Sequence, residues 1–239
     1  MNQGPSDTRR TFLVAAGVAA GGLLAPAVGW EARAFALPEK KEEAKAEEIS
    51  PAEDLMREHG ALNRVLLIYD EELRRLRADQ DMDISVLASA ADIIRHFVED
   101  YHEKLEEDYL FPRFRKAGKL VGLVDTLLQQ HQAGRQLTEQ IRALAVTGTI
   151  KDPTQRRQLS DALHAFIRMY RPHEAREDTV LFPAFRGIVS LHEYGALGED
   201  FEKKEDELFG EGGFFKVVDQ IAELESKLGI YDLRQFTPR

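Results

Sequence analysis

The chain has 239 residues, of which 43% are hydrophobic, and this is enough for a globular domain of ordinary size. It contains no cysteine, which excludes disulfides, iron–sulfur clusters, thiolate zinc sites and cysteine nucleophiles, so any bound metal must have nitrogen and oxygen ligands. A formal net charge of −10 argues against a nucleic-acid or anionic-membrane partner.

Residues 1–36 have the pattern of an export signal. Arg9 and Arg10 precede an apolar run over residues 12–30, and small-residue cleavage patterns end at Ala27 and Ala36. This pattern is typical of a twin-arginine signal, and it predicts a periplasmic or other extracytoplasmic protein with no stable membrane insertion after signal removal. An amino-terminal membrane anchor is the alternative, although the run is rich in Gly and Ala and only marginally apolar. Residues 37–49 are dominated by Lys, Glu and Ala, which indicates a solvated linker.

Residues 50–186 predict four long helices. The first begins at Ser50, where an N-cap, a proline and a capping-box glutamate combine, and it ends near residue 78. The second covers about residues 84–110 and is expected to break at Phe111-Pro112, because proline disfavours helical geometry in the residue before it. The third follows Gly118 and fades at Gly148.

The fourth helix starts at Asp152-Pro153, and a kink is expected at Pro172. Short connections between four long helices predict an all-α, antiparallel up-down-up-down four-helix bundle. Residues 187–239 form a further C-terminal helical extension, with a capping box at residues 190–193, a break at residues 210–213 and an amphipathic helix at residues 214–228. We expect this extension to pack across the bundle.

The motif H-E-x-x-E-[ED]-x-x-L-F-P-x-F occurs twice, beginning at His102 and at His173. Another histidine in a helical pattern lies about forty residues before each copy, His59 before the first and His131 before the second. This separation is the length of two helices and a turn. The sequence therefore describes a duplicated helical hairpin, and each copy offers one histidine and one His-x-x-x-Glu pair.

Helical geometry places the motif side chains on one face. Glu106 lies about 40° round the helix from His102, and Glu103 about 100°, on the side that apolar neighbours bury. Isolated buried carboxylates cost several kcal/mol each unless cations neutralise them. The pattern thus predicts two metal ions, each with two imidazoles, bridged by carboxylates. The candidate ligands are His59, His102, Glu103, Glu106, His131, His173, Glu174 and Glu177.

Several neighbouring residues have other interpretations. Glu103 and Glu174 lie farther round their helices from the motif histidines than Glu106 and Glu177 do. They are either metal ligands or hydrogen-bond partners between helices. Glu107 and Asp178 lie about 140° from the motif histidines and are expected to be solvated. Three further histidines receive no functional assignment because they lie off the buried face or in the extension: His96, His164 and His192.

Over residues 50–186 the repeated motif resembles the hemerythrin-like, HHE cation-binding class. That resemblance implies a four-helix bundle around a non-haem di-iron centre, with ligands at His59, His102 with Glu106, His131, and His173 with Glu177. Oxygen-carrying members have a second histidine four residues after the third-helix ligand, where this chain has Arg135. The resemblance is therefore closer to the iron-sensing F-box members than to the oxygen carriers.

These observations predict a protein that binds two iron ions and that binds or senses a small oxidant, namely dioxygen, peroxide or nitric oxide. Manganese or zinc would also fit nitrogen and oxygen ligands. No Ser/His/Asp set or phosphate loop is present, which favours binding over turnover of an organic substrate. Two alternatives stay open: a di-iron oxidase or peroxidase of ferritin-like logic, and an interaction protein that the metal only stabilises.

Arg135 lies four residues after His131, so its guanidinium should enter the same core region. A buried arginine needs an anion, and Glu103 or Glu174 is the nearest unassigned carboxylate. The sequence therefore predicts that Arg135 holds one of them beside the metal ligands. The alternative is that Arg135 extends past the site to solvent.

Overall fold

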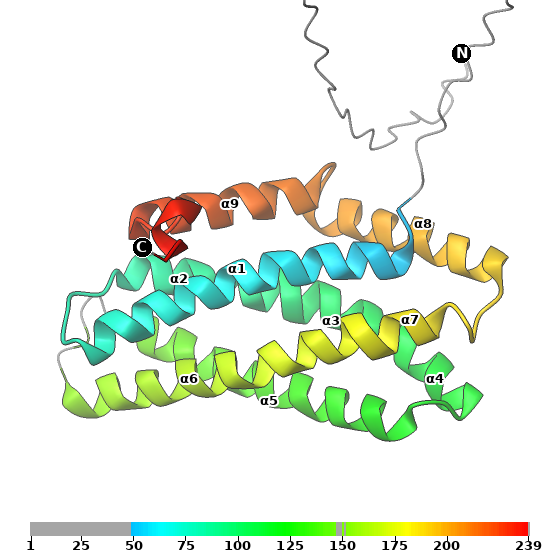
Figure 1. Cartoon of the computed structure of the whole chain (residues 1–239), viewed down its shortest axis with the longest axis horizontal. Coiled ribbons are helices and arrows are strands. Elements are labelled where there is room, and N and C mark those ends of the chain that lie inside the picture. The colour runs from blue at the N-terminus through cyan, green and yellow to red at the C-terminus, as the bar shows by residue number, and fades with distance from the viewer. Residues whose placement is uncertain (1–48, 147–149, 151, 239) are drawn as a thin grey trace, which may run out of the picture. The chain divides into compact units, whose positions relative to one another are not determined.

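The computed structural model describes residues 49–146, 150 and 152–238, and every regular element within these ranges is a helix (Figure 1). The all-α prediction is therefore confirmed for the described part of the chain. The predicted signal, residues 1–36, and the linker up to residue 48 lie outside the described residues. None of the described helices is both long and apolar enough to span a membrane.

Helix α1 (Pro51–Arg77) begins as its sequence predicts. The side chain of Ser50 accepts a hydrogen bond from the Glu53 N–H at 3.3 Å, and Pro51 occupies the first turn, where no intrahelical donor is needed. The buried face of α1 carries His59 among apolar residues that include Leu55 and Leu62. This helix therefore presents an imidazole to the core rather than to solvent.

The second long helical segment is continuous through five elements. These are α2 (Ile84–Ile93), the π-helical η1 (Ile94–His102), α3 (Glu103–Leu105), the π-helical η2 (Glu106–Leu110) and α4 (Phe111–Ala117). The predicted break at Phe111-Pro112 is wrong, because the chain stays helical until Gly118 ends it with a φ of 63°.

The π-helical segment explains how the helix tolerates Pro112. A proline ring inside an α-helix clashes with the carbonyl four residues earlier and removes one N–H donor. In η2 the N–H of Phe111 instead bonds to the carbonyl of Glu106, five residues back, which widens the helix just before the proline. The second motif repeats this arrangement in η3 (Glu177–Leu181). Both π segments begin at the motif glutamate, so the widening also sets where that side chain points.

The second hairpin consists of α5 (Val121–Ala145) and α6 (Pro153–Arg176), which continues through η3 into α7 (Phe182–Phe185). Asp152 caps α6 by accepting from the Thr154 N–H at 2.8 Å, as predicted. Helix α6 runs through Pro172 to Arg176, and the kink expected there stays a prediction. The predicted fading of the third helix at Gly148 falls on residues 147–149, which lie outside the described ranges.

The C-terminal extension contains α8 (Leu191–Phe209), α9 (Gly213–Leu228) and a short 3-10 helix (Leu233–Phe236). Ser190 caps α8 by accepting from the Glu193 N–H at 3.1 Å. Both helices and the break between them are confirmed where the sequence predicts them.

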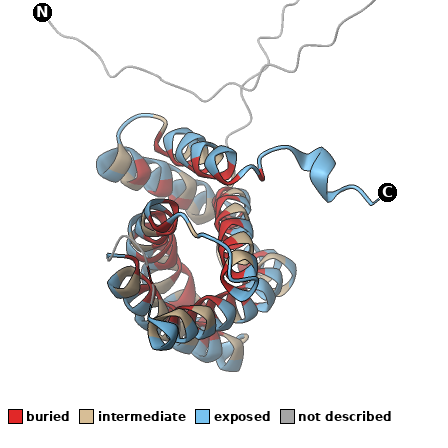
Figure 2. Ribbon diagram, turned by 90° about the vertical axis from the view of Figure 1, so that its left-hand side faces the viewer, coloured by how far each residue is buried: buried red, intermediate tan, exposed pale blue. Residues whose placement is uncertain are grey.

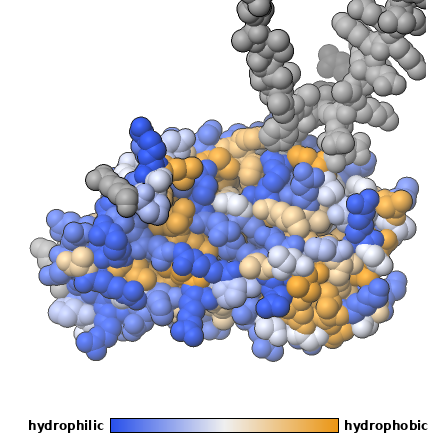
Figure 3. All heavy atoms as spheres, viewed as in Figure 1, coloured by the Kyte–Doolittle hydropathy of each residue, from blue (hydrophilic) through white to orange (hydrophobic). Residues whose placement is uncertain are grey.

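The described helices pack around the motif-bearing faces. Helix α6 packs on α1 and α5, and α5 also packs on α2, while α8 and α9 cover the other side of α1 (Figure 1). Seen end-on, buried residues line the inner sides of the helices (Figure 2). One face is mainly hydrophilic, with hydrophobic residues gathered in patches, one of them toward the end where α4 and α7 lie (Figure 3). The α1–α2 hairpin thus contacts both the α5–α6 hairpin and the α8–α9 hairpin.

Candidate metal centre

Four imidazoles meet in the core, one from each of α1, η1, α5 and α6. The Nε2 atoms of His59 and His102 lie 3.1 Å apart, and the rings of His131 and His173 have their centroids 5.0 Å apart. All four residues are buried, with exposed fractions between 0% and 4%. The fold therefore brings the four predicted histidine ligands together.

Glu106 and Glu177 lie between these imidazoles and are fully buried. Glu177 Oε2 is 3.1 Å from His173 Nε2 and 3.4 Å from His59 Nε2. Glu106 Oε2 is 3.3 Å from His131 Nε2, and its Oε1 is 3.8 Å from His102 Nε2. Each carboxylate thus lies between one histidine of its own helical segment and one histidine of the other hairpin.

The chemistry of this set fits metal ions. Both oxygens of Glu106, both oxygens of Glu177 and His131 Nε2 are buried without a hydrogen-bond partner, which is costly for polar atoms unless a ligand satisfies them. Two groups of ligand atoms share Glu106, and within each group the atoms lie within 4.8 Å of one another. One group consists of Glu106, His131, His173 and Glu177, and the other consists of His59, His102 and Glu106. Mixed imidazole and carboxylate donors suit iron and neighbouring transition metals.

A second layer of polar groups orients every imidazole through its Nδ1 atom. Glu58 Oε2 lies 2.7 Å from His102 Nδ1, and Gln130 Oε1 lies 2.9 Å from His173 Nδ1. Such contacts fix the tautomer and direct Nε2 toward a metal. Sequence reasoning missed Glu58 and Gln130, although each directly precedes a predicted ligand, His59 or His131.

The remaining two imidazoles use Asp178 and Glu107. Asp178 Oδ1 lies 2.7 Å from His59 Nδ1, and Glu107 Oε1 lies 3.1 Å from His131 Nδ1. The prediction that both carboxylates are merely solvated is therefore wrong. Both residues lie off the ligand face of their own helix, but both side chains reach a histidine of the opposite hairpin.

Glu103 occupies a different environment from Glu106. It accepts a hydrogen bond from the Tyr170 hydroxyl at 2.7 Å and pairs with Arg135 at 2.7 Å. Arg135 also lies 2.8 Å from Glu107. Glu103, Glu107 and His131 form a further group of metal-compatible atoms, but the guanidinium already supplies a positive charge there. The ligand role predicted for Glu103 stays a prediction.

Glu174 is the counterpart of Glu103 in the second hairpin. It accepts a hydrogen bond from the amide of Asn63, and it belongs to none of the metal-compatible groups found among the described residues. Its predicted ligand role likewise stays a prediction. Asn63 follows His59 by four residues, as Arg135 follows His131, so the repeat extends to the groups that hold these two carboxylates.

In the absence of metal, the pKa values of the site residues are shifted in different directions. Burial lowers the pKa of His131 to about 4, and burial together with the nearby His59 lowers the pKa of His102. Burial also lowers the pKa of His59, but the nearby carboxylates of Asp178 and Glu177 outweigh it and raise this pKa to about 10. Burial and the charge of Glu177 raise the pKa of Glu106. Protons thus occupy part of the site when no metal does.

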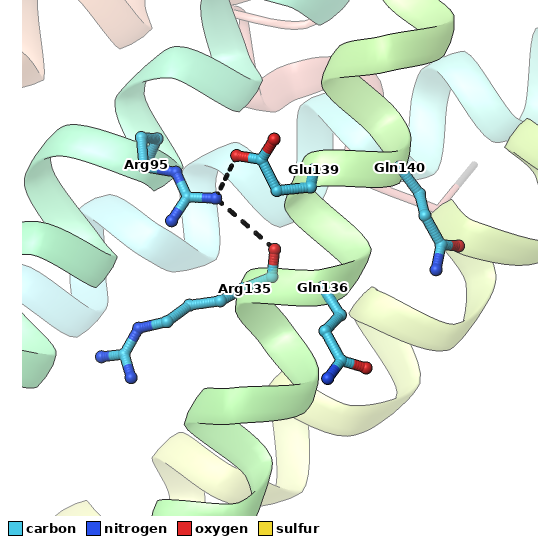
Figure 4. A pocket seen from close by; sticks show the side chains of 5 residues that line it. All are labelled: Arg95, Arg135, Gln136, Glu139 and Gln140. Atoms are coloured by element: carbon cyan, nitrogen blue, oxygen red, sulfur yellow. Dashed lines mark hydrogen bonds and ion pairs between the residues drawn. The ribbon is translucent and has the colours of Figure 1, made fainter.

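Arg135 lies between the carboxylates of Glu103 and Glu107 and the protein surface. Its side chain lines a hollow of about 640 Å³ together with Arg95, Gln136, Glu139 and Gln140 (Figure 4). Arg95 donates to Glu139 and to the backbone carbonyl of Arg135, which holds the arginine backbone in place. The predicted pairing of Arg135 with Glu103 is present, and the side chain is 23% exposed, so it does not extend freely into solvent.

The three histidines without a predicted role lie at the surface. His96, His164 and His192 are exposed, and His96 lies 3.4 Å from the exposed Asp100.

The hemerythrin HHE cation binding domain model matches this chain over residues 50–185 and again over residues 123–224. Proteins of Mycobacterium tuberculosis and Mycobacterium bovis, whose names state no function, are each 50% identical to it over 190 residues, which cover 80% of this chain and 74% of each relative. No solved structure matches it. The chain therefore belongs to the hemerythrin HHE cation-binding family, whose domains bind metal ions, typically iron.

Proposed function

We propose that this protein holds two iron ions between its two hairpins and that it binds or senses a small oxidant, namely dioxygen, peroxide or nitric oxide. In this proposal α1, the α2–α4 segment, α5 and the α6–α7 segment form an antiparallel up-down-up-down bundle around the two ions. The observation that carries it is the pair Glu106 and Glu177, whose four buried oxygens lack hydrogen bonds while each carboxylate reaches histidines of both hairpins.

The protein's own residues prepare this site for metal and for a small ligand. The four Nδ1 atoms are held by Glu58, Asp178, Glu107 and Gln130, so the four Nε2 atoms face inward. Bound iron would supply the electrons that a small oxidant accepts. The ring of Phe182 stacks on His59 and the ring of Phe111 on His131, which keeps bulk water away from both imidazoles.

The test is to load the full chain with iron(II) without oxygen and then add peroxide, dioxygen or nitric oxide in stoichiometric amounts. We expect a change in the visible spectrum that Glu106→Ala abolishes and that Asp108→Asn, an exposed neighbour on the same helical segment, retains. Many turnovers of peroxide without loss of iron would instead favour a peroxidase. A holoprotein spectrum that no oxidant changes, combined with unfolding of Glu106→Ala, would favour a metal-stabilised interaction protein.

We also propose export by the twin-arginine route, on the basis of Arg9 and Arg10 before the apolar run. Such export would place the mature protein in the periplasm or another extracytoplasmic compartment, cleaved after Ala27 or Ala36. Replacing both arginines by lysine should leave the precursor uncleaved inside the cell. Export that continues in this variant would contradict the assignment, and the amino terminus of the exported protein would identify the cleavage site.

A further inference from the structure

An aromatic cluster joins the C-terminal extension to the segment that carries His102. Phe97 and Tyr101, both in η1, are each 1% exposed. The ring of Phe209, the last residue of α8, meets the ring of Phe97 at a centroid distance of 5.6 Å and that of Tyr101 at 5.4 Å, both edge-on. The ring of Phe214 in α9 lies 6.4 Å from that of Phe97. Two residues of the extension thus pack against η1 just before its motif histidine.

The turn between α8 and α9 holds the two phenylalanines of the extension in place. An added Cβ atom on Gly213 would lie 2.5 Å from the Cβ atom of Phe209, so the two helices approach too closely for any larger residue. The N–H of Phe214 donates to Glu205 Oε1 at 2.8 Å, and the guanidinium of Arg57 in α1 lies 4.4 Å from the centre of the Phe214 ring. These contacts keep both rings against η1.

The π-helical form of η1 makes this packing important for His102. The segment has nine residues, and the N–H of Glu103 bonds to the carbonyl of Val98, five residues back. Because π-helices are rare and mostly occur as single turns, a segment of this length depends on the packing of its side chains. A change toward the α-helical period would rotate the His102 side chain about the helix axis, away from Glu58 and His59.

Tyr101 links the aromatic cluster to His102 in a second way. Its hydroxyl interacts with the carboxylate of Glu58. Glu58 Oε2 in turn lies 2.7 Å from His102 Nδ1. A displaced Tyr101 would therefore disturb both the backbone that carries His102 and the carboxylate that orients it.

We propose that Phe209 and Phe214 are positioning residues for the metal centre, because they hold η1 in its widened form and thereby place His102 for one of the two ions. This inference rests on the two-ion centre proposed above. His102 belongs with His59 and Glu106 to one group of ligand atoms, whereas the other group contains no residue of η1. Loss of the aromatic contacts should therefore weaken the binding of one ion more than that of the other.

The experiment titrates iron(II) into the full chain without oxygen, in competition with a chelator. It compares the wild type, Phe209→Leu, Phe214→Leu and the control Ile221→Val, and thermal melting shows whether each variant is folded. Phe209 and Phe214 are only partly buried, so the fold should tolerate leucine, which keeps apolar bulk but removes the ring. Ile221 is buried in α9, two helical turns beyond Phe214, so its replacement perturbs the packing of the extension away from the aromatic cluster.

We expect one of the two iron ions to bind about tenfold more weakly in Phe209→Leu, while the affinity for the other ion stays unchanged. Phe214→Leu should have the same effect to a smaller extent, because its ring lies farther from that of Phe97. Ile221→Val should bind both ions as the wild type does. If Phe209→Leu does not fold, Phe214→Leu decides the question.

Unchanged affinities for both ions in Phe209→Leu would overturn the proposal. Equal weakening of both ions, or the same weakening in Ile221→Val, would also overturn it, because the extension would then act only on overall stability. A wild-type chain that does not bind two iron ions would count against the proposed centre instead, so the two proposals fail separately.

Discussion

The two hairpins differ most in the layer of side chains behind the six inner ligands. Glu58 and Gln130 occupy equivalent positions, and each accepts from the Nδ1 of the second histidine of its hairpin. One is a carboxylate and the other a neutral amide. Asn63 and Arg135 are likewise equivalent, and each holds a buried glutamate of the other hairpin. The inner ligands thus follow the repeat, whereas the charges behind them do not.

This difference follows what packs against each half. Glu58 lies beside Tyr101 and beside Glu205 of α8, whereas Arg135 lies between the metal centre and a surface hollow. The duplicated sequence therefore specifies the ligand geometry. The outer positions differ because one half packs against a covering helix and the other half lies beside solvent.

Arg135→Leu should have the largest effect among changes that remove this asymmetry. It leaves Glu103, which is 1% exposed, without its cationic partner, and breaking a buried pair costs about 3–5 kcal/mol. Metal affinity should fall by about 10–100-fold, because Glu107 and His131 lose their support. Denaturant unfolding and metal titration measure these changes. The matched control Asn63→Leu removes only a neutral donor and should cost about 1–3 kcal/mol. Equal losses in both variants would contradict the comparison.

Gly134→Ala should have the second-largest effect on stability. A Cβ atom at this position would lie 2.0 Å from the Tyr170 hydroxyl, so the ring that donates to Glu103 must move. Overpacking of this kind costs about 1–3 kcal/mol. Gly122→Ala on the same helix is the control, because nothing lies within 4 Å of its added Cβ atom. Thermal melting compares the two. A Gly134→Ala protein as stable as Gly122→Ala would show that the close approach is unimportant.

The pH dependence of metal binding should distinguish His59 from His131, the first histidine ligands of the two hairpins. In the metal-free protein the pKa of His59 is raised to about 10, while that of His131 is lowered to about 4. At neutral pH a metal must therefore displace a proton from His59 but not from His131. Affinity should rise about tenfold per pH unit for this proton until the pH reaches about 10.

Competition with a chelator at pH 7, 8 and 9 measures this slope. The raised pKa of Glu106 acts in the same direction. Affinity that levels off above the ordinary histidine pKa of 6.5 would contradict the assignment of the proton to His59.

Glu58→Gln makes the first hairpin match the second and should have the smallest effect. Burial raises the pKa of Glu58 to about 8, but this carboxylate can still ionise when a metal binds, whereas glutamine can only accept from His102 Nδ1. Iron affinity should therefore fall by about tenfold or less. The reciprocal Gln130→Glu should raise the affinity by a similar factor. Isotherms for both variants test this, and an increase on Glu58→Gln would show that the negative charge behind His102 does not support metal binding.

The sequence predicted the elements that local rules determine. Caps at Ser50, Asp152 and Ser190 and the repeated motif correctly placed the long helices and brought the four histidines together. The π-helical segments were missed because the standard helical period cannot show where a helix widens before proline. Asp178 and Glu107 were missed because their partners lie on the opposite hairpin, and this depends on packing rather than on spacing.

The most direct measurement of the central claim is the iron content of the full chain after loading without oxygen. Elemental analysis should give two iron ions per chain, held by four imidazoles with Glu106 and Glu177 between them. Glu106→Ala should lower that number, because this carboxylate belongs to both groups of ligand atoms. One iron per chain, or none, would contradict the dinuclear centre.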